Sequence, residues 1–250
     1  MMNRLILIPL LLSTASMNFA FNASDNASNY GSGWTDLSNN GTGFNPWGFL
    51  VPDAHDDVNT AEIADSTAGA GDINTGDSSF RLASDTGSGL DVIRSFSGGA
   101  SLGAGDVFSF DLSANYRNGN KGFDLRNAGT GLFNFNVGSD NYFFGDTDLG
   151  AEGWTYVSDG VYSLEFGFVT ETIMNAKITR TSGSDTTRFF EIPNVALSAP
   201  INNFKFYVSG TDNDSANNSL YFNNLEVIPE PSAYGLILGA LALAALARRR

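Results

Sequence analysis

Residues 161–168 read VYSLEFGF, and this stretch decides the fold class. Its apolar side chains occupy every second position: Tyr162, Leu164, Phe166 and Phe168. A period of two is the spacing of a β-strand, in which successive side chains point to opposite faces of a sheet. The stretch therefore predicts a strand with one face on a core and the other toward solvent.

The same alternation recurs along the chain. It is clear at 108–112, 133–137 and 204–208, and weaker at 79–83, 92–96, 122–125, 172–181, 187–192 and 220–227. Turn residues separate these runs, and Asp159-Gly160 is expected to close a hairpin between residues 154–158 and 161–168. Only residues 53–65 fit a short helix. About a dozen short strands predict an all-β fold, a single β-sandwich of the jelly-roll or concanavalin-like type, over residues 21–228. Two smaller β domains are the alternative, but no Pro- or Ser-rich linker divides the chain.

Composition supports a folded and acidic body. The chain has 250 residues, 42% of them hydrophobic, with 20 Phe, which is enough for a substantial core. It carries 27 acidic and 13 basic residues, and the terminal segments hold four of the basic ones, Arg4 and Arg248–Arg250, so the body between them is more acidic still. Such a negative surface repels phosphate backbones, so we expect no nucleic acid among its partners. The chain has no cysteine, which excludes disulfides and thiolate chemistry.

The first 20 residues have the layout of a secretory signal peptide. Arg4 precedes the apolar run 5–12, and small residues follow. The run is shorter than the 20 or so residues that span a bilayer. We expect export and cleavage after Ala20 or Ala15; a buried N-terminal strand or helix is the alternative.

The other end, "VIPEPSAYGLILGALALAALARRR" (residues 227–250), also reads as a membrane signal. Residues 232–247 carry no charge and are rich in Leu and Ala, which predicts an apolar helix just long enough to cross a bilayer. The prolines before it stop the helix from extending N-terminally. The terminal arginines hold that end in the cytoplasm by the positive-inside rule.

Three parts in this order, Pro229-Glu230-Pro231, a short apolar helix and Arg248, Arg249 and Arg250, resemble the PEP-CTERM sorting signal of Gram-negative bacteria. The resemblance covers residues 229–250 and implies that an exosortase recognises the motif and acts near it. It also implies transient membrane attachment through residues 232–247, followed by presentation at the cell surface or in an extracellular matrix such as that of a biofilm. The body between the ends resembles other members more weakly, and that likeness supplies no active site.

Chemistry in the body is harder to find. The lone His55, in PDAHDDVN, has no indicated partner, and Glu165 and Glu171 do not form a known glycosidase motif. We therefore expect a non-enzymatic protein with no catalytic residue and no required cofactor or metal. A secreted glycan hydrolase is the less favoured alternative.

Two binding functions stay open at this point. The acidic segments GDTDLG (145–150) and TDNDSANNS (211–219) offer oxygens for a structural calcium ion, although neither matches an EF-hand. Trp34, Trp47 and Trp154 would suit stacking against sugar rings, which makes the body a candidate carbohydrate-binding module for exopolysaccharide. Packing in the core or on a sheet face is the alternative, and the commoner use of such rings.

Overall fold

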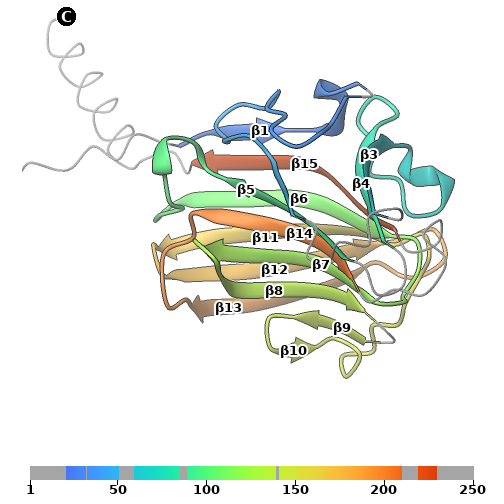
Figure 1. Ribbon diagram of the computed structural model, residues 1–250. Coiled ribbons are helices and arrows are strands. Elements are labelled where there is room, and N and C mark those ends of the chain that lie inside the picture. Colours follow the sequence, from blue (N-terminus) through green and yellow to red (C-terminus); the bar gives the residue numbers. More distant parts are fainter. Residues whose placement is uncertain are drawn as a thin grey trace, which may run out of the picture.

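The fold is a sandwich of two antiparallel β-sheets (Figure 1). The computed structural model describes residues 21–31, 33–50, 59–84, 89–138, 141–209 and 219–229. The larger sheet has the order β13 (Arg188–Ala196), β12 (Ile173–Thr181), β11 (Val161–Thr170), β6 (Asp106–Ala114), β15 (Ser219–Pro229), β4 (Ser79–Ala83) and β3 (Thr60–Ala64). A further strand, β1 (Ala23–Asp25), pairs with β15. We call this the eight-stranded sheet.

The second sheet has seven strands among the described residues. Its order is β10 (Thr147–Asp148), β9 (Asn141–Phe144), β8 (Thr130–Gly138), β7 (Asn120–Asn127), β14 (Asn203–Ser209), β5 (Gly89–Ser95) and β2 (Gly48–Leu50). Three short 3-10 helices, η1 (Ala27–Asn29), η2 (Ser66–Ala68) and η3 (Ser97–Gly99), lie in the connections. The all-β sandwich prediction is confirmed.

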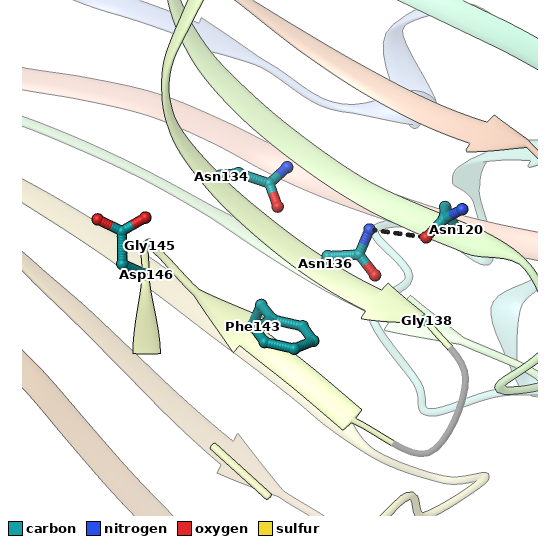
Figure 2. Close-up of a pocket in the computed structure, with 7 residues that line it drawn as sticks. All are labelled: Asn120, Asn134, Asn136, Gly138, Phe143, Gly145 and Asp146. Atoms are coloured by element: carbon teal, nitrogen blue, oxygen red, sulfur yellow. Dashed lines mark hydrogen bonds between the residues drawn. The ribbon is translucent and has the colours of Figure 1, made fainter. Parts of the chain in front are cut away.

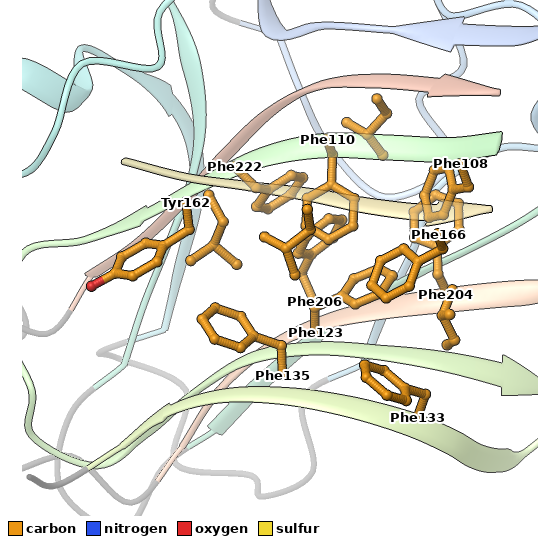
Figure 3. Packing of buried hydrophobic residues seen from close by; sticks show 14 of the residues in the cluster. Phe108, Phe110, Phe123, Phe133, Phe135, Tyr162, Phe166, Phe204, Phe206 and Phe222 are labelled. Atoms are coloured by element: carbon orange, nitrogen blue, oxygen red, sulfur yellow. The ribbon is translucent and has the colours of Figure 1, made fainter. Parts of the chain in front are cut away.

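Phenylalanine rings fill the space between the sheets (Figure 3). They come from the alternating positions of both layers, so Phe110 and Phe166 of the eight-stranded sheet face Phe123 of the other, with ring centroids 4.3 and 5.7 Å from Phe123. Phe206 and Phe222 stack across the layers at 3.8 Å. Burial of each such side chain contributes about 1.5–3 kcal/mol. The apolar side chains at every second position of the strands therefore hold the two layers together.

Two local predictions were wrong. Residues 60–64, inside the run that fitted a short helix, form strand β3, because this segment extends along β4 and Glu62 ion-pairs with Arg81 there; residues 51–58 lie outside the described part. Asp159-Gly160 does make a turn, but residues 154–158 form no strand. Strand β11 pairs with β6 on one side and β12 on the other, which leaves no free edge for the segment before it, and Trp154 of that segment is buried against Arg180.

Among the described residues, no helix is long and apolar enough to cross a membrane. The predicted signal peptide, 1–20, and the predicted membrane helix, 232–247, lie outside that part of the chain. Pro229, the first residue of the sorting motif, is the last residue of β15 and pairs with Asp106 of β6. Glu230, Pro231 and the terminal arginines lie outside the described residues.

Candidate functional site

The outward face of the seven-stranded sheet carries the best-organised polar cluster of the described chain. Because side chains alternate, the strands that send Phe123, Phe135 and Phe206 into the core send their other side chains outward. The outward set lies in two adjacent rows across β5, β14, β7 and β8: Asp91, Tyr207, Gly122 and Asn136 in one, and Ile93, Lys205, Asp124 and Asn134 in the other. The site is built on these rows.

Tyr207 ties three strands together. Its hydroxyl oxygen accepts hydrogen bonds from Nδ2 of Asn134 at 2.8 Å and from Nδ2 of Asn136 at 2.9 Å. The strand between them has Gly122 at this place, and a Cβ there would lie 2.9 Å from the Tyr207 oxygen and 1.9 Å from the Phe135 carbonyl oxygen. Only a residue without a side chain lets the ring cross β7 to reach β8. The two amides are therefore held in fixed positions.

A charge cluster supports the second row. Nζ of Lys205 lies 3.1 Å from Asp91 and 3.3 Å from Asp124, and it also lies over the Tyr207 ring at 4.9 Å from the centroid. Arg126 approaches the same Asp124 carboxylate at 3.7 Å. These half-buried groups neutralise one another, so the two cations are not free to attract an anionic ligand.

A hollow of about 630 Å³ opens beside these amides (Figure 2). Its lining residues are Asn120, Asn134, Asn136, Gly138, Phe143, Gly145 and Asp146. Nδ2 of Asn134 donates to the Asp124 carboxylate at 2.7 Å and to the Phe123 carbonyl at 3.2 Å, which fixes the orientation of the amide. Its oxygen is left on the side nearer to Phe143, as Figure 2 shows. The fixed asparagine side chains thus present hydrogen-bond acceptors to the hollow.

An apolar ring and a carboxylate complete this lining. Phe143 of β9 points outward, opposite Asn136, and is 39% exposed. Asp146, in the turn between β9 and β10, is also exposed. A flat apolar surface beside several acceptors suits a ligand that carries both hydroxyl groups and C–H faces.

A second hollow, of about 580 Å³, adjoins the first and shares Asn134, Gly145 and Asp146 with it. It extends to the edge strand β13, where the pairing with β12 is interrupted between Ala176 and Met174. At this bulge Asn194 has a φ of 55°, and residues 192–196 line the second hollow. We call these two adjoining hollows together the groove; their lining residues extend from β7 and β8 to β13.

The tyrosine in this site is a neutral group at physiological pH. Burial raises the pKa of Tyr207 to about 12, and the Asp124 and Asp91 carboxylates act in the same direction, against the hydrogen bonds from Asn134 and Asn136. A phenol that keeps its proton is a poor general base. It serves here as a fixed acceptor for the two amides.

The three tryptophans form no sugar-stacking platform and take the alternative, core packing. Trp34, Trp47 and Trp154 are 3%, 0% and 3% exposed, so none offers a ring face to a ligand. Trp34 and Trp47 pack edge-to-face at 5.5 Å inside the aromatic core. Trp47 also lies against the buried guanidinium of Arg94, which ion-pairs with Asp25 and anchors the N-terminal segment.

Glu165 and Glu171, which match no known glycosidase motif in the sequence, form no carboxylate pair in the groove. Glu165 lies on the outward face of the eight-stranded sheet, where it pairs with Lys177 at 3.4 Å, and Glu171 lies in the turn after β11. Neither lines the groove. His55 lies outside the described residues.

For calcium, the structure tests only one of the two predicted segments. Asp146 lines the groove, whereas Asp148 accepts a hydrogen bond from the backbone N–H of Gly150 at 2.8 Å, as turn residues commonly do. Within the described ranges, no three His, Cys, Asp or Glu side chains gather in a group that fits a metal ion. Residues 211–218 of the other segment lie outside these ranges.

Sequence reasoning did not find the amide pair. In the sequence, Asn134 and Asn136 are only the polar half of an alternating strand, which is what an exposed face of any sheet shows. The available signal was Gly122, a glycine inside a predicted strand, since such a residue often marks a close approach of another group.

Comparisons with known proteins give fold likenesses only. No protein-family model and no curated protein matches the chain. Similar solved structures include the PL-14 alginate lyase from Aplysia kurodai (TM-score 0.42, 11% identity, 72% of this chain and 90% of that one) and lectin II from Ulex europaeus (0.43, 9%, 86% and 99%). Another is the endo-β-1,4-glucuronan lyase from Trichoderma reesei (0.44, 12%, 72% and 90%). At these identities, function does not transfer from any of them.

Proposed function

We propose that this protein is an exported, non-enzymatic surface or matrix protein whose body binds a neutral glycan in the groove on the outward face of the seven-stranded sheet. The observation that carries the proposal is the pair Asn134 and Asn136, held by Tyr207 with their amide oxygens on the side of an exposed aromatic ring. Fixed polar groups beside an apolar ring are a common arrangement in sites that orient small ligands.

The charge of the groove favours a neutral ligand over an acidic one. Its lining offers amide and carboxylate oxygens, whereas the neighbouring cations Lys205 and Arg126 are engaged by Asp124. The body as a whole is strongly acidic, with a formal net charge of −14 for the whole chain. A neutral ligand can donate hydrogen bonds from its hydroxyl groups to these acceptors without repulsion. The carboxylates of a uronate chain would be repelled by them.

The same groups support binding rather than catalysis. Hydrolysis of a glycoside commonly needs two carboxyl groups about 5–9.5 Å apart, one of them free to give or take a proton. Two acids line the groove, Asp124 and Asp146. Asp124 is held by two cations, so only Asp146 is left, among the described lining residues, as a carboxyl group for such a reaction. Tyr207 keeps its proton.

Delivery to the surface is the part of the proposal that rests on the terminal sequences. Residues 1–20 direct export, Pro229-Glu230-Pro231 is the motif for exosortase, residues 232–247 hold the chain in the membrane, and Arg248–Arg250 fix its orientation. Replacing Pro229, Glu230 and Pro231 together by Ala should leave the protein unprocessed in the membrane fraction. Normal processing and release of that variant would refute the role of the motif.

Glycan binding is tested on an array that carries neutral and uronate oligosaccharides, with the full-length protein in mild detergent. Asn136→Ala and Phe143→Ala should each weaken binding to the best neutral ligand about tenfold, the effect of losing roughly 1.4 kcal/mol. Glu165→Gln, an exposed change on the other sheet, should bind like the wild type.

Three results would contradict this proposal. Binding that survives both groove substitutions would place the site elsewhere, and a preference for uronates would refute the charge argument. Shortened or unsaturated products after incubation with a bound oligosaccharide would show an enzyme.

A further inference from the structure

The lining of the two hollows follows strand β8 along its length. The first hollow is lined by Gly138, Asn136 and Asn134, which Figure 2 shows in this order along the strand, and the second by residues 131–134. A strand rises about 3.3 Å per residue, so residues 131–138 span roughly 23 Å. This length is several times that of one sugar ring, so a single sugar residue can fill only part of the groove.

The two hollows meet at the turn between β9 and β10. Asn134, Gly145 and Asp146 line both of them. The backbone N–H of Gly145 donates to the carbonyl oxygen of Asn134 at 2.7 Å, which fixes this turn against β8. Strand β9 pairs with β8 only from Phe135 to Gly138, so the second hollow borders the part of β8 beyond this pairing. A ligand that lies over Asp146 therefore reaches both hollows.

The second hollow has contact groups of its own. Pro193, Val195 and Ala196 of β13 supply apolar C–H surface. Asn194, which lies among them, is exposed, and its backbone N–H donates to Oδ1 of Asn175 at 3.0 Å, which fixes the bulge of β13. A polar group held beside apolar surface is the combination that the first hollow offers with Asn136 and Phe143, so each hollow suits a sugar residue of its own.

Exposed residues line the groove at both ends. Asn120 of β7 is exposed beside the first hollow, and Pro193 and Ala196 are exposed beside the second. A pocket that encloses a small ligand buries most of the ligand's surface. Here a longer chain can continue past these exposed residues in both directions, so the lining suits sugar residues inside a chain better than a chain end.

We propose that one extended, linear and neutral polysaccharide chain occupies both hollows through its internal residues, following β8 and passing over Asp146 between the two. This inference rests on the proposed glycan binding and makes it more specific. A chain of β-1,4-linked hexoses is straight and can follow a strand over this length, whereas an α-1,4-linked chain coils and would leave the groove after one hollow.

The length of the bound chain is measured by calorimetric titration of the full-length protein in mild detergent. The probes are β-1,4-linked glucose and β-1,4-linked mannose oligomers of two to six residues, with α-1,4-linked glucose oligomers as the coiled comparison. Affinity for the better β-1,4 series should rise at least about tenfold from the disaccharide to the pentasaccharide. Borohydride reduction of the end residue of the hexasaccharide should change its affinity less than about twofold, since the end is not recognised.

Two variants fill the second hollow without touching the first. Ala196→Trp and Gly131→Trp place a large ring at exposed lining positions, and a Cβ on Gly131 would meet its nearest neighbour, Cγ of Asp124, at an ordinary 3.8 Å. Both should lower the affinity for the pentasaccharide to about that for the disaccharide and leave disaccharide binding unchanged. Gly167→Trp on the other sheet, where a Cβ meets nothing within 4 Å, is the matched control and should bind like the wild type.

Phe143→Ala, in the first hollow, should weaken binding of every length. Equal affinities for the disaccharide and the pentasaccharide, full pentasaccharide binding by both tryptophan variants, or a preference for the coiled series would overturn the inference. So would array binding confined to branched glycans or to single terminal sugars; in each of these cases the proposed glycan binding still stands. Absence of any neutral ligand from the array would instead refute the proposed function, and this inference with it.

Discussion

The outward faces of the two sheets come from the same alternating pattern, yet they are organised differently. On the seven-stranded sheet, Tyr207 crosses a glycine to hold two amides, and Lys205 is enclosed by two carboxylates. On the eight-stranded sheet, the Lys177–Glu165 pair at 3.4 Å is 38% and 50% exposed. Polar residues on a strand thus become a site where their neighbours fix them, and remain a solvated face where they do not.

Two glycines give the sharpest way to break this comparison, since both lie mid-strand and both face outward. A Cβ on Gly122 would meet the Phe135 carbonyl at 1.9 Å, whereas a Cβ on Gly167 would meet nothing within 4 Å. We expect Gly122→Ala to lower the free energy of unfolding by about 3 kcal/mol and to abolish glycan binding. Gly167→Ala should raise it by about 0.5 kcal/mol, because glycine weakens a strand. Urea denaturation measures both, and similar effects at the two positions would contradict the close-approach argument.

A smaller effect is expected at alkaline pH. The pKa of Tyr207 is raised to about 12 in the folded protein, from about 10 in the unfolded chain. The unfolded chain therefore loses this proton first, so the stabilisation is complete below pH 10 and is lost as the pH rises toward 12. The shift corresponds to about 2–3 kcal/mol.

Tyr207→Phe isolates that contribution from the other buried tyrosines, such as Tyr142 and Tyr162, whose pKa values burial also raises. The difference in unfolding free energy between wild type and Tyr207→Phe should shrink between pH 10 and pH 12. A difference that stays constant over this range would contradict the raised pKa.

The two lysines provide the next test. Lys205→Met leaves Asp91 and Asp124 half-buried without their shared cation, which should cost about 1–2 kcal/mol. Lys177→Met removes an exposed pair and should cost less than about 0.5 kcal/mol. Thermal unfolding of both variants at low and high salt measures this, and equal costs would mean that the charge cluster is no better organised than the other face.

The smallest effects on stability are expected at two exposed rings. Phe143 and Phe189 are 39% and 55% exposed, one beside the groove and the other on the edge strand β13. Changing either to Ala should alter the unfolding free energy by less than about 1 kcal/mol. Only Phe143→Ala should reduce glycan binding, and an equal loss from Phe189→Ala would show that any exposed ring suffices.

Much of the fold was predictable because strand periodicity is a local signal. The run 79–83 matches β4, and 172–181 matches β12 to within one residue. Strands β1, β2 and β10 have only two or three residues, too few to show a period. Whether the sandwich is of the concanavalin-like or jelly-roll type stays a prediction.

The site was less predictable, because it depends on register between distant strands. Tyr207 meets Gly122 and Asn136 only because β14, β7 and β8 pair in one particular register. The tryptophans are ambiguous in the sequence for a related reason: their size suits sugar stacking, but the same size makes them useful in a core, where Arg94 gives Trp47 a buried partner. Residue type alone does not distinguish the two uses.

The position of β15 has a consequence for the order in which the protein is made. This strand, the last one described along the chain, lies in the interior of its sheet between β6 and β4 and also pairs with β1, some 200 residues earlier. The central hydrogen bonds of the larger sheet therefore form only after nearly the whole body has been synthesised. Until then the chain lacks its final packing, and its folding is expected to be slow because distant segments must meet first.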